Sequence, residues 1–268
     1  MPWPVDVLIN NFAIRSFRET ADKDYITARM AYRARLIQPY RWSALHCLEK
    51  YIKGICLLNR IKSHSGHSVL AGVELIEKSG KLSLDLSPAT KQFISHLEES
   101  GAEFRYYEAS YYNREFDIIR LDKAVWEIRR YCQPLNYEIN LNDGTQKNML
   151  HLNLERVKNS VSKKEKGSCI TGGVLENIIK DKNHPARKSL VWNNLFFGPS
   201  KRKSVKMRPD WECGNSPFFL HPEIIDEVVK YVHIPKRIAT QVRDFAQQQA
   251  TKKTASASEE AMSAEAKQ

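Results

Sequence analysis

Apolar residues recur at helical spacing through most of the first half of the chain. From Ser16 to Leu36 an apolar or small residue returns every three or four positions, at Phe17, Ala21, Tyr25, Ala28, Tyr32 and Leu36. Pro39 interrupts this pattern, and a second apolar stripe runs from Trp42 to about Asn59. The same spacing predicts further helices at 69–78, 88–100 and 117–134. The first half is therefore predicted to be an all-helical domain.

The pattern changes after Pro134. Residues 137–141 alternate in polarity, residues 142–144 read Asn-Asp-Gly, and residues 145–154 are predicted to return as the partner strand of a β-hairpin. A loop is predicted at 161–173, and short helices at 172–181, 185–194, 222–232 and 235–249. The last segment has no large apolar residue except Met262, which predicts disorder. We therefore expect a mainly α protein with a helical domain at 1–136, a smaller α+β region at 137–250 and a disordered tail at 251–268.

Composition narrows the class of protein. The sequence contains no run of about 18 apolar residues, so no membrane span is predicted. The first residues, MPWPVDVLINNF, lack a basic leader and a long apolar stretch, and we expect no secretory signal. Five scattered cysteines without C-x-x-C spacing favour neither a disulfide framework nor a zinc cluster. A cytoplasmic protein without a metal or cofactor is the expectation.

The positive charge is concentrated in one segment. The formal net charge is +11, and residues 158–208 hold thirteen basic and three acidic residues, a net of +10. Such a local field attracts polyanions, with phosphate contacts supplying affinity. The candidate nucleic-acid-binding residues are Lys163, Lys164, Lys201, Arg202, Lys203, Lys206 and Arg208. Aromatic residues flank the run at 201–208 and are predicted either to stack on bases or to lie in the core: Trp192, Phe196, Phe197 and Trp211.

Four short motifs carry a resemblance to a known family. They are Asp-Tyr-x-x-Ala-Arg at 24–29, Leu-Glu-Lys-Tyr-Ile-Lys at 48–53, Gly66-His67, and Arg-Tyr-Tyr at 105–107. In this order and spacing, residues 12–137 resemble the HEPN superfamily of nucleotide-binding helical bundles. The resemblance implies an up-and-down helical bundle that is frequently paired as a homodimer. It implies nothing about the basic second half.

The resemblance also raises the possibility of RNA cleavage. Catalytic HEPN members carry an Arg, four to six further residues, and a His on or just before the last helix; they cleave RNA without metal. Imidazole moves protons at the ribose 2′-hydroxyl and the leaving oxygen, while Arg stabilises charge on the phosphate. Here the last predicted helix contains no His. The spacing occurs instead at Arg41–His46 and Arg60–His67, where the histidines can equally be a packed residue and a loop anchor.

Three functions therefore stand open. The first choice is a HEPN-like protein that binds RNA, or a nucleotide, through its basic C-terminal region and lacks the usual catalytic pair. The first alternative is a metal-independent ribonuclease of the toxin–antitoxin or phage-defence type, using His46 or His67 with Arg41 or Arg60. The second is an interaction subunit that partners a nucleotidyltransferase or a defence complex. No histidine spacing in the second half specifies a metal site.

Overall fold

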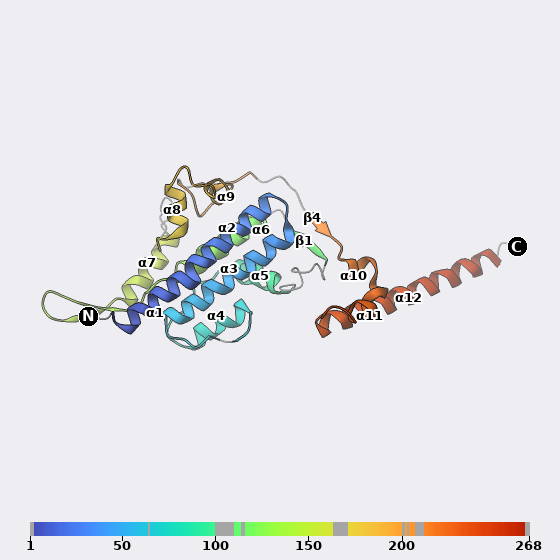
Figure 1. Ribbon diagram of the computed structural model, residues 1–268, viewed down its shortest axis with the longest axis horizontal. Coiled ribbons are helices and arrows are strands. Elements are labelled where there is room, and N and C mark those ends of the chain that lie inside the picture. The colour runs from blue at the N-terminus through green and yellow to red at the C-terminus, as the bar shows by residue number, and fades with distance from the viewer. Residues whose placement is uncertain are drawn as a thin grey trace. The chain divides into compact units, whose positions relative to one another are not determined.

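A computed structural model of the chain describes residues 3–63, 65–99, 110–113, 116–162, 171–199, 202, 204–206 and 212–265 (Figure 1). It divides into two compact units. The first comprises Met1–Ala102 and Arg114–Asp210, and the second Glu103–Asn113 and Trp211–Gln268. The first unit holds the large core and all the candidate residues discussed below.

The first unit begins with the predicted helical bundle. Its helices are α1 (Val5–Ala13), α2 (Glu19–Arg33), α3 (Ile37–Leu58), α4 (Val69–Lys78), α5 (Pro88–Glu99) and α6 (Asp117–Arg129), with a π-helical turn η1 (Ile14–Arg18) joining α1 to α2. Helix α3 is central, since 14 of its 22 residues are buried. A Cβ on Gly54 of α3 would lie 3.0 Å from both Cys132 Sγ and Phe17 Cβ, so glycine permits this close packing. The mainly α fold is confirmed.

The predicted β-hairpin is also present in this unit. Strand β2 (Glu138–Asn140) pairs antiparallel with β3 (Gln146–Asn148), and Gly144 in the connecting turn has φ +82°. The return strand was predicted too long, because helix α7 (Leu150–Ser162) starts two residues after β3. Leu150, Leu154 and Val157 follow helical spacing and pack on the bundle core, so a periodicity of 3.6 competes with strand alternation there.

The segment after α7 completes the same core. Helices α8 (Val174–Lys180) and α9 (Arg187–Val191) pack against α2, as Figure 1 shows. The apolar residues that join the bundle core from beyond residue 136 are Val157, Leu175, Ile178, Leu190 and Phe197. The structure therefore differs from the predicted domain boundary at 136/137. After residue 136 the helices and strands of this unit become shorter, which changes the sequence pattern. The hydrophobic core nevertheless includes residues on both sides of that boundary.

The second unit is small. Its elements are β1 (Tyr111–Asn113) paired with β4 (Glu212–Gly214), α10 (Pro217–Leu220), the 3-10 turn η3 (Pro222–Ile224), α11 (Ile225–Val228) and α12 (Lys236–Glu265). Its core consists of Phe218, Ile225, Ile234, Ile238 and Ala239. Helix α12 extends through most of the segment predicted to be disordered. That segment is rich in Ala, Glu and Lys, which favour helix without needing a core.

Within the described ranges, no helix is both long enough and apolar enough to cross a bilayer.

Candidate functional site

Helix α3 carries one polar stripe on an otherwise buried surface. Trp42, His46, Glu49 and Lys53 are spaced by four, three and four residues, which places them on one face. Lys50 borders this stripe and forms an ion pair with Asp24 of α2, Nζ to Oδ2 2.5 Å. The signal was readable in the sequence as polar residues recurring at helical spacing among apolar ones, but sequence reasoning missed Glu49, Lys50 and Lys53 as site residues.

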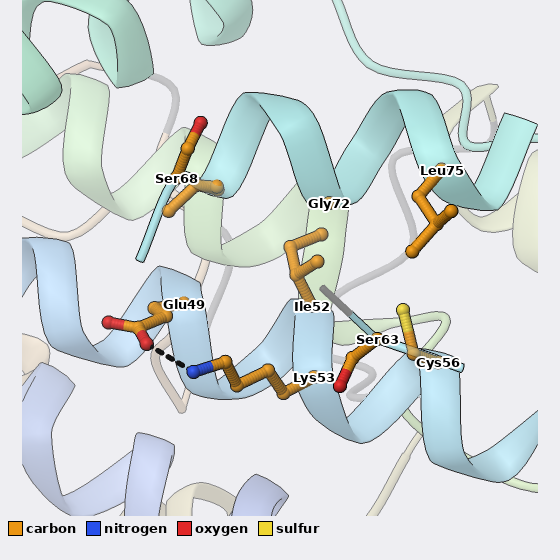
Figure 2. Close-up of a pocket in the computed structure, with 9 residues that line it drawn as sticks. Glu49, Ile52, Lys53, Cys56, Ser63, Ser68, Gly72 and Leu75 are labelled. Atoms are coloured by element: carbon orange, nitrogen blue, oxygen red, sulfur yellow. Dashed lines mark hydrogen bonds and ion pairs between the residues drawn. The ribbon is translucent and has the colours of Figure 1, made fainter. Parts of the chain in front are cut away.

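Glu49 is the centre of this surface. Its Oε1 accepts hydrogen bonds from Lys53 Nζ at 2.6 Å and from His67 Nδ1 at 3.0 Å; Figure 2 shows Glu49 and Lys53 meeting along α3. Burial alone would raise the pKa of Glu49, but the hydrogen bonds and charges of Lys53 and His67 outweigh it and lower that pKa. Glu49 is thus ionised at neutral pH. An ionised carboxylate only accepts hydrogen bonds, so His67 Nδ1 must carry the proton.

His46 belongs to the same group of residues. Its imidazole packs against the indole of Trp42, with ring centroids 4.1 Å apart. Partial burial lowers the pKa of His46; the carboxylates of Glu49 and Asp24 oppose that change, while Lys50 and His67 add to it. The structure therefore brings His46 and His67 into electrostatic range of each other around Glu49. We call His46, Glu49, Lys53 and His67 the surface histidine cluster.

The surface histidine cluster is open to solvent on one side. The His67 side chain is 84% exposed, whereas that of Glu49 is 11% exposed. Because Glu49 engages Nδ1, His67 presents Nε2 outward. Two imidazoles of different environment, one neutral and one held by a carboxylate, can take and deliver a proton in one reaction.

The N-terminus of α4 fixes the position of the loop that carries His67. The next residue, Ser68, caps α4 by accepting a hydrogen bond from Ala71 N at 3.1 Å. Glu98 of α5 accepts from Leu70 N at 3.2 Å and also from Val69 N, which adds a carboxylate at the helix N-terminus. The loop that carries His67 is therefore anchored on both α3 and α4.

A small apolar cavity lies between α3 and α4 next to this surface. Figure 2 shows residues that line it, among them Ile52, Cys56, Gly72 and Leu75. Its volume is about 10 Å³, at the lower limit for a single water molecule. Any substrate of the surface histidine cluster must bind on the open face.

The two Arg–His pairs predicted from spacing are arranged differently. Arg41 is 3% exposed and contacts His96 Nε2 of α5, and five residues of helix separate it from His46 by about 140° around α3. Arg60 binds Asp6 Oδ1 of α1 at 2.8 Å, while His67 binds Glu49. The structure places the two histidines within electrostatic range of each other and directs each arginine to another partner.

Among the predicted basic residues, Arg202 and Lys206 are described and both are exposed; Lys163, Lys164, Lys201, Lys203 and Arg208 lie outside the described residues. Four more exposed cations belong to the same segment: Lys158, Lys180, Lys182 and Lys188. None of these six cations forms an ion pair with a carboxylate in the part of the chain that the structure describes.

Of the flanking aromatic residues that the structure describes, one lies in the core and two are half-buried. Phe197 is buried and packs against Tyr25 and Trp126, so it is a core residue. Phe196 is half-buried and also packs against Trp126. Trp192 is half-buried, with the guanidinium of Arg33 over its ring at 5.5 Å. Trp211 lies outside the described residues.

A second charged cluster is fully interior. Arg129 of α6 binds Asp22 of α2 through two parallel hydrogen bonds of 2.7 and 2.8 Å, and Glu176 of α8 through two of 2.7 and 2.9 Å. Tyr51 donates to the same Asp22 at 2.6 Å. Burial opposes the charged form, yet the carboxylates outweigh it and raise the pKa of Arg129 further above its ordinary value. We call Asp22, Arg129 and Glu176 the interior ion cluster.

A parallel arrangement lies along the same helices. Asp22, Tyr25 and Arg29 share one face of α2, and Asp122 shares a face of α6 with Arg129. Arg29 pairs with Asp122 and donates from Nε to Ser189 O at 2.9 Å. Tyr25 donates to Asp122 at 2.6 Å. Both sets of contacts attach residues 171–197 to the bundle.

Among the described residues, no group of three or more His, Cys, Asp or Glu side chains is placed to hold a metal ion.

Comparison with known proteins gives one match. Residues 14–133 match the family model of the HEPN domain, a range that covers the bundle from η1 to α6 and the surface histidine cluster. No curated protein and no solved structure matches the chain.

Proposed function

Residues 14–133 form a HEPN domain, and on that premise we propose that the protein binds RNA through the basic residues that follow the domain. HEPN domains are associated with RNA or nucleotide functions and often dimerise. The observation that supports the proposal is the set of six exposed cations between Lys158 and Lys206 that have no carboxylate partner among the described residues. They belong to the segment attached to the bundle by the interior ion cluster. We propose a homodimer through the bundle as the binding species.

Unpaired cations suit phosphate binding for a physical reason. A lysine already paired with a carboxylate must give up that partner before it can neutralise a phosphate, whereas these six need only release solvent and anions. Neutralising phosphates also releases the counterions condensed on the nucleic acid, so the affinity must fall steeply with salt. An acidic protein surface has no condensed counterions of this kind, so binding to it should depend less steeply on salt.

The test is RNA binding at two salt concentrations. Fluorescence anisotropy with a labelled oligouridine at about 50 and about 200 mM salt compares the wild type with the triple variant Lys180→Gln, Lys182→Gln, Arg202→Gln. Loss of three phosphate contacts lowers the slope of log affinity against log salt by about 2 on a single strand. The control triple variant, Lys23→Gln, Lys62→Gln, Lys147→Gln, removes the same charge from exposed positions elsewhere. Equal binding by both variants would overturn the proposal.

We propose, as a second candidate, metal-independent RNA cleavage at the surface histidine cluster, because the structure brings His46 and His67 together around Glu49. His46, whose pKa is lowered, is the base that takes the proton of the ribose 2′-hydroxyl. His67 must enter this step as the imidazolium: with Nδ1–H bound to Glu49, it delivers the second proton, from Nε2, to the leaving 5′-oxygen. Lys53 and Lys50 border the position of the phosphate.

Cleavage of the same oligouridine in the presence of a chelator tests this second candidate. His46→Gln and His67→Gln should each lower the rate by about 10²–10⁴-fold, the usual contribution of one general acid or base. His151→Gln is the control, since His151 is an exposed histidine on α7. If the wild type retains RNA without cleaving it, the protein is a binder. If it neither binds nor cleaves RNA, the role of interaction subunit for a nucleotidyltransferase or defence complex is favoured.

A further inference from the structure

Two arginines of α2, Arg29 and Arg33, contact residues 189–192. Arg33 donates from Nη1 to Ser189 Oγ at 2.9 Å, one helical turn after Arg29 donates to the carbonyl of the same serine. The guanidinium of Arg33 also lies over the ring of Trp192, 5.5 Å from its centroid. Ser189 is buried, so the hydroxyl that anchors Arg33 belongs to the packed interior. The side chain is therefore held by two contacts from a segment far away in sequence.

Arg33 uses one of its five N–H donors in the part of the chain that the structure describes. Neither Nε nor Nη2 has an acceptor in the described part of the chain, and no carboxylate there pairs with the guanidinium. These two nitrogens form one edge of the planar group, the edge that binds two oxygens of a phosphate side by side. Arg33 is half-buried, and contacts at Nη1 and at the ring of Trp192 restrain it beforehand. Little conformational entropy remains to be lost on binding.

Two other cations belong to the segment that Arg33 contacts. Lys188 is exposed and adjoins Ser189 in sequence. The carbonyl of Lys206, another exposed lysine, accepts a hydrogen bond from Asn193 Nδ2 at 3.1 Å, next to Trp192. The backbone at two cations of the basic segment thus lies close to residues that contact Arg33 or adjoin its contacts. Sequence distance hid this, since Arg33 lies 155 residues before Lys188 and 173 before Lys206.

We propose that Arg33 is a phosphate-binding residue for the RNA backbone, with its Nε–Nη2 edge on one phosphate and with Lys188 and Lys206 on neighbouring ones. This site rests on the proposed RNA-binding function and extends it from the basic segment onto the HEPN domain itself. Its specific element is the fork of donors, which a lysine at the same position does not supply.

Anisotropy with the labelled oligouridine at about 50 and about 200 mM salt tests the site. Arg33→Gln should weaken binding about tenfold and lower the salt slope by about 0.7, as expected for one phosphate contact on a single strand. Arg33→Lys should keep the salt slope and still bind about threefold to tenfold more weakly, because the charge stays while the fork is lost. Ser189→Ala should weaken binding by a smaller factor, since it frees the anchored guanidinium.

Arg15→Gln is the matched control, because Arg15 is an exposed, unpaired arginine in η1 at the other end of the same helical run. If Arg33→Gln binds as well as Arg15→Gln while the Lys180, Lys182, Arg202 variant loses binding, the RNA-binding function stands and this site is wrong. If the wild type fails to bind RNA, both are wrong. If Arg33→Lys binds RNA as tightly as the wild type does, a single positive charge is sufficient at this position. The proposed paired contact of Nε and Nη2 with one phosphate would then be wrong. Unchanged thermal unfolding of each variant verifies that binding, and not folding, is measured.

Discussion

The interior ion cluster and the surface histidine cluster lie in the same unit and use the same types of residue. Each joins basic groups to carboxylates from different elements. In the interior ion cluster, Arg129 is 2% exposed and Asp22 is fully buried, and every carboxylate is matched by guanidinium or hydroxyl donors. In the surface histidine cluster the buried carboxylate of Glu49 is paired with a half-buried Lys53 and an exposed His67. The interior ion cluster has no exposed polar group that could contact a ligand, whereas the surface histidine cluster exposes the imidazole of His67 to water.

This difference separates a structural role from a chemical one. A buried ion is costly unless each of its polar atoms is matched, so a buried cluster persists only when it is complete. A half-exposed cluster can exchange water for a substrate without leaving an unmatched charge. Titratable groups that act on substrates are therefore expected where pairing is partial, as around Glu49. The following four predictions test this contrast.

The largest expected effect is on the interior ion cluster. Arg129→Met would leave Asp22 and Glu176 buried without their cation, and the free energy of unfolding should fall by about 3–5 kcal/mol. Urea unfolding followed by circular dichroism measures it. Lys53→Met, the matching change in the surface histidine cluster, should cost about 1 kcal/mol or less. Equal losses in the two variants would contradict the contrast between the clusters.

The second prediction concerns the anchor of the surface histidine cluster. Ser68→Ala removes the N-cap of α4, and the free energy of unfolding should fall by about 1 kcal/mol. Ser68→Asp, which preserves a capping oxygen, is the control and should retain most of the stability. Because His67 precedes this cap, its imidazole resonances should also broaden or shift in Ser68→Ala. An unchanged His67 would show that Glu49 alone holds the ring.

The third prediction addresses Glu49 itself. Glu49→Gln keeps an oxygen acceptor for Lys53 but removes the charge, so the stability should change by about 1 kcal/mol or less. The neutral amide no longer fixes His67 with its proton on Nδ1. Nitrogen NMR of the imidazole should therefore show a mixture of tautomers in the variant and one tautomer in the wild type. A single Nδ1-protonated tautomer in both proteins would exclude Glu49 as the group that sets it.

The smallest effect is a pH dependence of stability. The pKa of His46 is lowered in the folded protein, so the unfolded chain takes up its proton first as the pH falls from about 6.5. The folded state therefore loses stability as the pH falls from the pKa of His46 in the unfolded chain to its lowered pKa in the folded protein. Above the pKa of the unfolded chain, His46 is neutral in both states and this loss is absent. His46→Gln should lose less stability than the wild type between about pH 7 and about pH 5. The lowered pKa of Glu49 acts below this window, where carboxylates titrate. Parallel curves for the two proteins would contradict the prediction.

Local pattern predicted much of the fold. Helix α4 begins and ends at the predicted residues 69 and 78, and the hairpin turn forms at the predicted Asn-Asp-Gly. Helix α3 begins at Ile37, earlier than predicted, because Pro39 is tolerated in a first helical turn. Helix α7 was missed because its first residues follow the hairpin directly and their apolar positions were assigned to the return strand.

The candidate site was predicted in part. His46 and His67 were identified from spacing, but each was assigned an arginine that the structure directs elsewhere, Arg41 to His96 and Arg60 to Asp6. Spacing along one chain places residues on a face and does not reveal which element that face meets. Glu49, which binds His67 and acts on His46 through its charge, was readable in the sequence only as part of the polar stripe on α3 and of a family motif.

The sequence by itself determined the helices, the HEPN resemblance and the concentration of positive charge, because helix periodicity and net charge are local or additive properties. Tertiary structure decided that residues 171–197 complete the bundle and that Arg29 and Arg129 form buried ion pairs. It also decided that Arg33 and His67 keep ring or guanidinium nitrogens that can contact a ligand. The physical reason is that pairing and burial depend on which distant segments pack together. An arginine on α2 has the same charge everywhere, but its neighbours determine whether it stabilises the fold or faces a ligand.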